Sequence, residues 1–316
     1  MSPALTSWAP HRPVRILAGT PPGGGLDRVA RALQAALAET GLLHVPLEVV
    51  NVPGDGARKV WGEVLQSPGE AHLLCIASTN LTTDRLLGLA TFGHAETTPI
   101  AILLSEAIAF CVPATSPWRD GADLVRALAA EAGVPRIVLA TALGNPNHIA
   151  LAQVARHAGA NPRALRVRAY DGAPEAVAAV VGGDAELGAV SAASIGPALR
   201  DGRLRVLAVS TPGRLPGPLA AVPSWNEQGV PCEIGAWRGV SAPAGLAPAA
   251  LAFWQQALAA CLRTESWQRA LEQQSWAPLH VSGAALAAYL LEEESAMREG
   301  MRQLGLLPEK KDLETP

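Results

Sequence analysis

The sequence contains no long apolar segment and no cluster of basic residues, and each absence excludes a class of protein. Apolar runs such as Ala71–Ala77 and Ile100–Leu104 are short and interrupted, so none can span a bilayer. The 25 Lys and Arg residues are scattered among 28 Asp and Glu residues, which argues against a nucleic-acid partner. With a net charge of −3, the protein cannot attract an anion through its overall field, so local donors would have to bind one.

Cysteine pairs and the common catalytic motifs are also missing. No C-x-x-C pair occurs, and no histidine lies near a cysteine at metal-ligand spacing. Cys75 and Cys111 lie in apolar runs, so we expect buried, inert thiols. There is no G-x-x-x-x-G-K-[ST] loop and no G-x-S-x-G elbow, although a catalytic triad assembled only in space would leave no such motif. We therefore expect no metal and no other cofactor.

The chain has enough apolar material for more than one core. It contains 316 residues, of which 49% are hydrophobic and only 17% charged, as in a globular protein. Strand and helix patterns alternate: Val14–Ala18 and Leu47–Val50 are expected strands, and apolar residues at helical spacing from Leu26 to Leu37 indicate a helix between them. The alternation resumes after Pro113 and is typical of a mostly parallel sheet.

We therefore predict an α/β fold, and the length favours two lobes. Crossovers between the lobes are expected near 111–113 and 235–239. The predicted lobes are residues 1–112 with 237–316, and residues 113–236.

The first candidate site is the loop from Thr20 to Asp27, between an expected strand and an expected helix. Gly23, Gly24 and Gly25 have no Cβ atom, so a ligand can come close to the backbone. The first N–H groups of the helix have no intrahelical acceptor and lie at its positive end, which suits an anion. The alternative is a plain turn in which Asp27 stabilises the helix start. Three consecutive glycines favour binding, because an ordinary turn does not need them.

The same glycines invite a dinucleotide-binding interpretation. That fingerprint is G-x-G-x-x-G, and Gly23 and Gly25 supply its first two positions, but Arg28 occupies the third. The next expected strand ends at Asn51, where an acidic residue would bind the ribose. Both mismatches argue against a nicotinamide-dependent oxidoreductase.

A second loop of the same kind spans residues 141–148. Asn145 is a favourable N-cap and Pro146 a favourable first helical residue, so Gly144, Asn145 and His148 surround another helix start that can bind an anion. The alternative is that Asn145 only caps the helix and His148 only packs, as a lone histidine usually does.

Weaker candidates follow other expected strands. Tyr170 can supply a phenol donor or a stacking face, or it can be a partly buried core residue. Ser78, Thr79 and Ser191 each offer a hydroxyl, but loop hydroxyls commonly cap turns.

Several segments together resemble the solute-binding receptors of tripartite tricarboxylate transporters, and they occur in that family's order over nearly the whole chain. The segments are Val14–Arg31, Val49–Gly54, Gly144–Ala150, Tyr170–Pro174, Gly182–Asp184, Asp201–Ser210, Val222–Pro223, Glu227–Gly229 and Trp237–Gly245.

The resemblance implies a two-lobed periplasmic-binding fold that closes on its ligand, and a receptor that performs no catalysis. In the family, two loops facing the cleft hold a ligand carboxylate through backbone N–H groups, hydroxyls and water. The receptor then delivers the ligand to membrane subunits of the transporter, and a monomer is expected. The matching residues are Gly23, Gly24, Gly25 and Asp27 in the first loop and Gly144, Asn145 and His148 in the second.

The chain departs from the family pattern at four loop positions. The family usually has an aromatic residue where Thr20 stands, Thr or Ser at Leu26, Ser at Asn145, and Lys or Arg at Asp171. A hydroxyl donor is lost and an acid replaces a base, so we expect an altered site. Aliphatic dicarboxylates, citrate-like acids, amino acids and aromatic acids all stay open as ligands.

The segment Met1–Trp8 has neither the basic nor the apolar region of a secretory signal. Because the family works outside the cytoplasm, we expect that a signal has been trimmed and that the protein is periplasmic. The alternative is a cytoplasmic carboxylate sensor or enzyme on the same fold.

Overall fold

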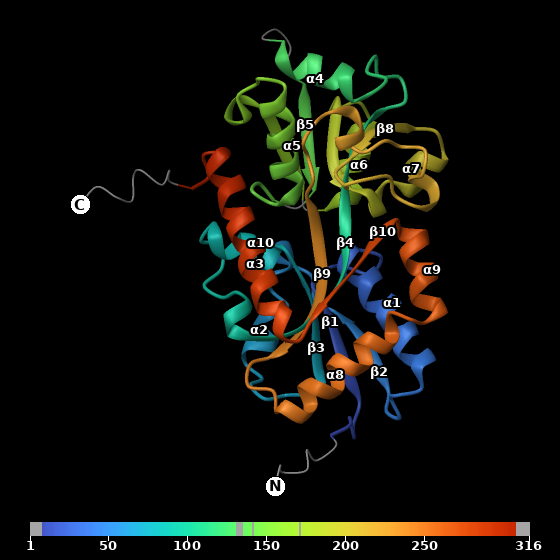
Figure 1. The fold of residues 1–316 in the computed structure, drawn as a ribbon, viewed down its shortest axis with the longest axis vertical. Helices are drawn as coiled ribbons and strands as arrows, with labels where there is room; N and C mark the ends of the chain where they lie inside the picture. The colour runs from blue at the N-terminus through green and yellow to red at the C-terminus, as the bar shows by residue number, and fades with distance from the viewer. Residues whose placement is uncertain (1–7, 131–134, 141, 171, 308–316) are drawn as a thin grey trace, which may run out of the picture. The chain divides into compact units, whose positions relative to one another are not determined.

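The computed structural model describes residues 8–130, 135–140, 142–170 and 172–307, and Figure 1 shows their fold. The chain divides into two compact units. Unit 1 comprises Met1–Leu104, Trp237–Leu271 and Pro278–Glu292, and unit 2 comprises Ser105–Ala236, Glu272–Ala277 and Glu293–Pro316. The lobe limits expected from the sequence stay a prediction.

The sheet of unit 1 is built around its first strand, which is covered on both faces. The strands lie in the order β2-β1-β3-β9-β4, with the bounds β1 Val14–Ala18, β2 Leu47–Asn51, β3 Leu73–Ser78, β9 Gly235–Pro243 and β4 Thr97–Pro113. β1 is parallel to β2 and β3, with Ile16 opposite both Val49 and Leu74. The carboxyl ends of these three strands therefore share one edge of the sheet, where ligands of α/β proteins usually bind.

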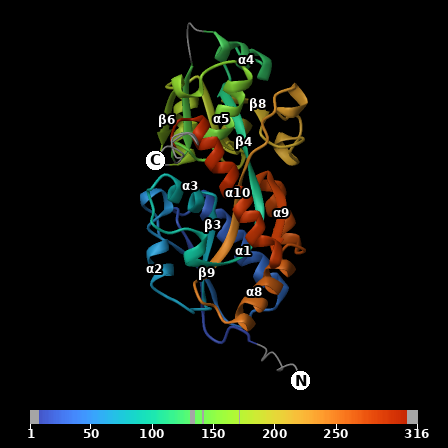
Figure 2. The ribbon, with the colours of Figure 1, turned by 60° about the vertical axis from the view of Figure 1, so that its left-hand side comes forward.

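The first candidate loop connects β1 to the helix that follows it in unit 1. This helix, α1 (Gly25–Thr40), buries Leu33 and Leu37 among its apolar face, and it ends at Gly41, whose φ of 66° suits glycine. It packs on the sheet and on α8 (Pro248–Cys261), which lies beside it in Figure 2. Two short helices of unit 1 are α2 (Trp61–Leu65) and α3 (Asn80–Leu86).

Unit 2 repeats the parallel arrangement with different strands. β5 (Arg136–Ala140) lies between β6 (Arg166–Tyr170) and β7 (Leu187–Ser191), and all three are parallel. β7 and β8 (Leu204–Val209) both pair antiparallel with β4. The core includes Phe110 and Trp225, whose rings meet edge-on at 5.0 Å. The helices are α4 Gly121–Ala129, α5 Pro146–His157, α6 Ala173–Val181 and α7 Gly196–Arg200.

The limits between the units fall inside five elements. These are β4, β9, α9 (Glu265–Gln274), β10 (Trp276–Ser282) and α10 (Ala284–Gln303). Short 3₁₀ turns occupy Asp55–Ala57, His94–Glu96, Pro162–Ala164, Ala192–Ser194, Gly217–Leu219 and Asn226–Gln228.

The alternation predicted an α/β fold, and this is confirmed, but the sheet is mixed rather than mostly parallel. β4 and β9 each belong partly to both units, and both pair antiparallel with neighbouring strands. The apolar segments 100–104 and 108–112 both lie in β4, one strand of 17 residues. Cys75 and Cys111 are fully buried as expected, and burial raises the pKa of the Cys111 thiol to about 12. No helix in the described ranges is long and apolar enough to cross a bilayer.

Candidate ligand-binding loops

The loop between β1 and α1 is shaped by two of its three glycines. Gly23 adopts a φ of +79°, which other residues rarely do. A Cβ atom on Gly24 would lie only 2.6 Å from both Cβ and Oγ1 of Thr20, so no larger residue fits there without moving the loop. The Thr20 hydroxyl also accepts a hydrogen bond of 3.1 Å from the N–H of Asp27. At Gly25, by contrast, a Cβ atom would meet nothing within 4 Å.

The carboxylate of Asp27 links three parts of this loop and its surroundings through hydrogen bonds. Its buried carboxylate accepts hydrogen bonds from the N–H of Gly23 at 2.7 Å, from Nδ2 of Asn51 at 2.8 Å and from Nε of Arg31 at 3.0 Å. Burial alone would raise the pKa of Asp27, but the hydrogen bonds from Arg31, Asn51 and Gly23 outweigh it and lower the pKa. Both carboxylate oxygens are thus already engaged, and a direct contact of Asp27 with a ligand stays a prediction.

Asn51, which in the sequence is only a mismatch to the dinucleotide pattern, is hydrogen-bonded to this loop. Its Nδ2 also donates to the carbonyl of Thr20 at 2.8 Å, so one amide ties β2 to both ends of the loop. Asn51 is opposite Ala18 in the parallel register. The rule that neighbouring parallel strands end at one edge could have indicated this contact.

Two donors are left at the start of α1. In the residues that the structure describes, the N–H groups of Gly25 and Leu26 donate to no protein acceptor. They lie at the positive end of a 16-residue helix. Such a pair of N–H groups can bind one carboxylate.

The loop before α5 in unit 2 uses a neutral network instead. Oδ1 of Asn145 accepts from the N–H of His148 at 3.1 Å, which caps the helix, and its Nδ2 donates to the carbonyl of Ala140 at 2.7 Å. The N–H of Gly144 donates to Nδ1 of His148 at 3.0 Å, and Gly144 has a φ of +80°. The expected cap is therefore present. Asn145 and His148 are also both buried, which protects these hydrogen bonds from water.

His148 presents a donor although it carries no charge. Burial lowers its pKa to about 4, so the ring is neutral at pH 7. Because Nδ1 accepts from Gly144, the proton of the neutral ring lies on Nε2. Within the described ranges, Nε2 has no hydrogen-bond partner. Asn147 is also buried, and neither its N–H nor its side chain has a partner among the described residues, so it is a donor that the sequence analysis missed.

The other predicted residues lie at strand ends beside these loops. Oγ of Ser78 accepts from the N–H of Asn80 at 3.3 Å, whereas Oγ1 of Thr79 is buried without a hydrogen-bond partner in the described part of the chain. Ser191 donates to the buried Glu106 at 3.0 Å, so its proton is used within unit 2. Tyr170 is partly buried beneath the guanidinium of Arg168, at 4.8 Å from the ring centroid. Asp171 lies outside the described residues.

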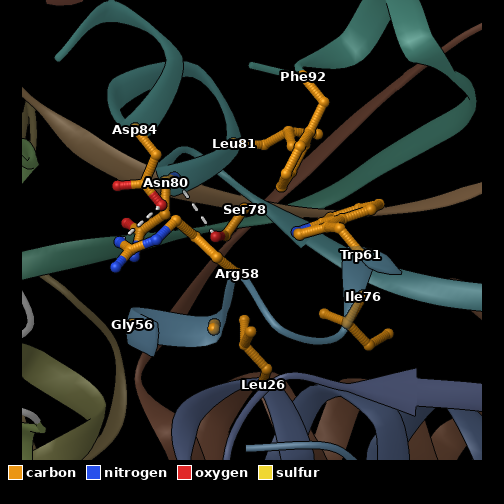
Figure 3. A pocket seen from close by; sticks show the side chains of 11 residues that line it. Leu26, Gly56, Arg58, Trp61, Ile76, Ser78, Asn80, Leu81, Asp84 and Phe92 are labelled. Carbon is orange, nitrogen blue, oxygen red and sulfur yellow. Dashed lines mark hydrogen bonds and ion pairs between the residues drawn. The ribbon is translucent and has the colours of Figure 1, made fainter. Parts of the chain in front are cut away.

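Each unit therefore gathers its own candidates at one sheet edge. In unit 1 the residue Leu26 and the strand end at Ser78 line one pocket, which Figure 3 shows from close by. In unit 2, Tyr170 and Ser191 are the last residues of β6 and β7, and His148 lies in the first turn of α5, the helix after β5. These three strands are parallel neighbours. The residues described contain no group of three His, Cys, Asp or Glu side chains that could hold a metal ion.

Comparison with known proteins first defines the class. A solute-binding protein of the TctC type from Polaromonas superposes with a TM-score of 0.69 at 27% identity, covering 93% of this chain and 99% of that one. An R. palustris protein with bound adipate gives a TM-score of 0.83 at 23% identity, covering 94% and 98%. The expected periplasmic-binding fold is confirmed, and the fold is that of solute-binding receptors.

The family follows from the sequence. Residues 29–306 match the model of the tripartite tricarboxylate transporter family receptor, and the chain belongs to this family. A protein from the tcbD-tcbE intergenic region of Pseudomonas sp. is 31% identical over 241 residues, which are 75% of this chain and 69% of the relative. BugT of Bordetella pertussis is 24% identical over 311 residues, 96% of this chain and 93% of the relative. The resemblance seen in the sequence motifs is confirmed.

Proposed function

We propose that this protein is a periplasmic receptor that captures a small organic carboxylate without altering it and delivers it to the membrane subunits of a tripartite tricarboxylate transporter. The proposal is supported above all by one observation. Two strand-to-helix loops, each held by its own hydrogen-bond network, leave backbone N–H groups at a helix start that have no acceptor among the residues the structure describes.

In this proposal the carboxylate accepts hydrogen bonds from Gly25 and Leu26 on one lobe. The N–H of Asn147 and Nε2 of His148 supply donors from the other lobe. Hydrogen bonds to a charged group contribute about 1.5–3 kcal/mol each, and these donors, fixed before the ligand arrives, supply the main favourable contacts against the cost of association. With a net charge of −3, the protein gains little from its overall field, and oriented dipoles must supply the affinity.

Closure of the two predicted lobes around the ligand would bring the two loops together. We propose that closure takes place by small rotations where the chain passes between the units, inside β4, β9, α9, β10 and α10. We propose that the receptor acts as a monomer, which light scattering after size-exclusion chromatography would test. The adipate found in the R. palustris structure is a ligand of the proposed kind.

The test is a thermal-shift screen of the purified protein against aliphatic, hydroxylated, amino and aromatic carboxylates, with nicotinamide cofactors included. A ligand that binds only the folded state raises the melting temperature by mass action. We expect a dose-dependent rise with one group of acids, and recovery of the acid unchanged by mass spectrometry. A rise with the nicotinamide cofactors alone, or conversion of the acid, would refute the proposal.

A further inference from the structure

A buried carboxylate is hydrogen-bonded to one of the candidate ligand residues of unit 2. Glu106 in β4 is only 1% exposed, whereas Ser191, the last residue of β7, is partly exposed. Oγ of Ser191 donates to Oε2 of Glu106 at 3.0 Å, and Nε1 of Trp276 donates to Oε1 at 3.0 Å. All three residues belong to unit 2. Each carboxylate oxygen therefore accepts a hydrogen bond, which offsets part of the cost of burying the group.

The chemistry of the three groups fixes the direction of both hydrogen bonds. The indole N–H of Trp276 can only donate, and a carboxylate can only accept. The hydroxyl of Ser191 carries a single proton, and that proton is directed at Glu106. On its exposed side, Ser191 therefore offers a ligand an oxygen that accepts hydrogen bonds but has no proton to donate.

A carboxylate at position 106 is needed for this polarity, and a neutral amide of the same shape would reverse it. The oxygen of a glutamine would accept from Trp276, because the indole N–H cannot accept from an amide NH2 group. The NH2 group would then face Ser191 and donate to it, and the Ser191 hydroxyl could direct its proton elsewhere. The distinctive effect of Glu106 is therefore on Ser191 and not on Trp276.

The acceptor at Ser191 contrasts with the donors beside it. β7 is the parallel neighbour of β5, and the helix after β5 begins with the N–H of Asn147 and Nε2 of His148 as donors. The carboxyl ends of parallel strands share one edge of the sheet, so the acceptor and the donors are gathered at the same edge. A ligand carboxylate suits the donors, whereas the lone pairs of Ser191 suit a hydroxyl or ammonium group of the same ligand.

From these observations we propose that Glu106 is a positioning residue that sets the ligand specificity of this receptor. By taking the proton of Ser191, it makes the end of β7 an acceptor that favours a ligand with a hydrogen-bond donor next to its carboxylate. This inference rests on the proposed function, because it takes a carboxylate to be bound at the start of α5. Glu106 is buried and acts through Ser191. An acid without such a donor leaves the Ser191 oxygen desolvated and without a partner, and so binds more weakly.

The test is isothermal titration calorimetry with three matched sets, each a plain acid with its 2-hydroxy and 2-amino derivatives. The sets are propionate with lactate and alanine, succinate with malate and aspartate, and phenylacetate with mandelate and phenylglycine. We expect the wild-type protein to bind a derivative about 10-fold more tightly than its plain acid in at least one set, as one well-formed hydrogen bond gives.

The decisive variant is Glu106→Gln, which keeps the shape of the side chain. It should bring the plain acid and its derivative within about 3-fold of each other, mainly by strengthening the plain acid, because Ser191 can then donate to it. A gain for one acid is a result that structural damage alone does not produce. Trp276→Phe is the matched control: it removes the other donor to Glu106, so it should lower the melting temperature and retain the preference.

A further variant keeps the test decisive if Glu106→Gln fails to fold. Ser191→Ala removes the acceptor itself and should abolish the preference. Equal binding within every set by the wild-type protein, or a preference that survives Glu106→Gln or Ser191→Ala, would overturn the inference and leave the proposed receptor function intact. Equal weakening of plain acid and derivative in Glu106→Gln would also overturn it, since Glu106 would then have only a structural role. Failure of every carboxylate to bind the folded protein would overturn both.

Discussion

The two candidate loops perform the same structural task with opposite electrostatics. In unit 1 the loop is held by the buried carboxylate of Asp27, which is ionised and paired with Arg31. In unit 2 it is held by Asn145 and a neutral His148. A helix start can therefore be prepared for an anion either by a compensated charge or by a wholly neutral network. The neutral network imposes no repulsion on a ligand carboxylate, whereas the charged one depends on Arg31, whose side chain is 52% exposed.

The same comparison predicts two different acid limits for stability. The pKa of Asp27 is lowered in the folded state, so its contribution is present above the unfolded pKa of 3.8 and is lost as the pH falls from there through the lower folded pKa. The pKa of His148 is lowered to about 4 from an unfolded value of 6.5, so its contribution is present above pH 6.5 and is lost as the pH falls toward 4. As the pH falls, the contribution of His148 in unit 2 should therefore be lost before that of Asp27 in unit 1.

The largest expected effect is on carboxylate affinity, from a substitution that distorts the loop of unit 1. In Gly24→Val, the new Cβ atom would lie 2.6 Å from two Thr20 atoms, so the loop must move. We expect about a 100-fold loss of carboxylate affinity, because two or more charge-assisted hydrogen bonds lose their geometry. Calorimetric titration measures the loss. Gly25→Ala is the control: its Cβ atom has open space, so the melting temperature should hold. Unchanged affinity in Gly24→Val would contradict the loop assignment.

The next largest effect is on the pH dependence of stability, from a substitution of His148 in the neutral network of unit 2. Asn can accept the Gly144 N–H as the imidazole does, but it does not titrate. In His148→Asn, the free energy of unfolding should therefore lose the part of its dependence on pH between 6.5 and 4 that His148 contributes, about 2–3 kcal/mol. Urea denaturation at several pH values measures this. Parallel curves for the two proteins would show that His148 is not buried as a neutral base.

A smaller effect concerns the cap of α5. Asn145→Ala removes the acceptor of the His148 N–H and should cost about 1–2 kcal/mol of stability. Asn145→Ser keeps a side-chain oxygen that can cap the helix with similar strength, so it should lose less, retaining the melting temperature within a few degrees. Differential scanning calorimetry distinguishes the two. Equal losses would mean that the bond from Asn145 to Ala140, and not the cap, stabilises the loop.

The smallest expected effect is on stability, from a substitution of Asp27, the charged residue that holds the loop of unit 1. Asp27→Asn keeps the side-chain shape but replaces one acceptor oxygen by an NH2 group that faces a donor, either Asn51 Nδ2 or the Gly23 N–H, and it removes the charge that strengthens the bond from Arg31, which should cost about 1 kcal/mol or more at pH 7. Because the pKa of Asp27 is lowered by folding, this difference should shrink as the pH falls below about 4. Thermal unfolding from pH 7 to pH 3 measures it. A gap that persists at pH 3 would show that the ionised form of Asp27 is not what stabilises the loop.

Local sequence signals predicted the two loops well, since glycines, N-caps and strand ends act over a few residues. Contacts between strands were harder to predict. Asn51 reaches the Thr20 loop only because β2 is parallel to β1, and Arg58 reaches Asp84 across separate elements. Ser105 and Glu106 are polar residues between two apolar segments, and such a pattern favours a break between two strands. In the structure they lie within β4, where buried Glu106 accepts hydrogen bonds from Ser191 and, at 3.0 Å, from Nε1 of Trp276.

The most direct test of the central claim is an NMR titration of ¹⁵N-labelled protein with the carboxylate that gives the largest thermal shift. If the backbone donors at the two helix starts hold the carboxylate, the amide signals of Gly25, Leu26 and Asn147 should move with the same saturation curve as the calorimetric titration. If these three signals stay fixed while the ligand saturates and other amides shift, the carboxylate binds elsewhere and the account of both loops is wrong.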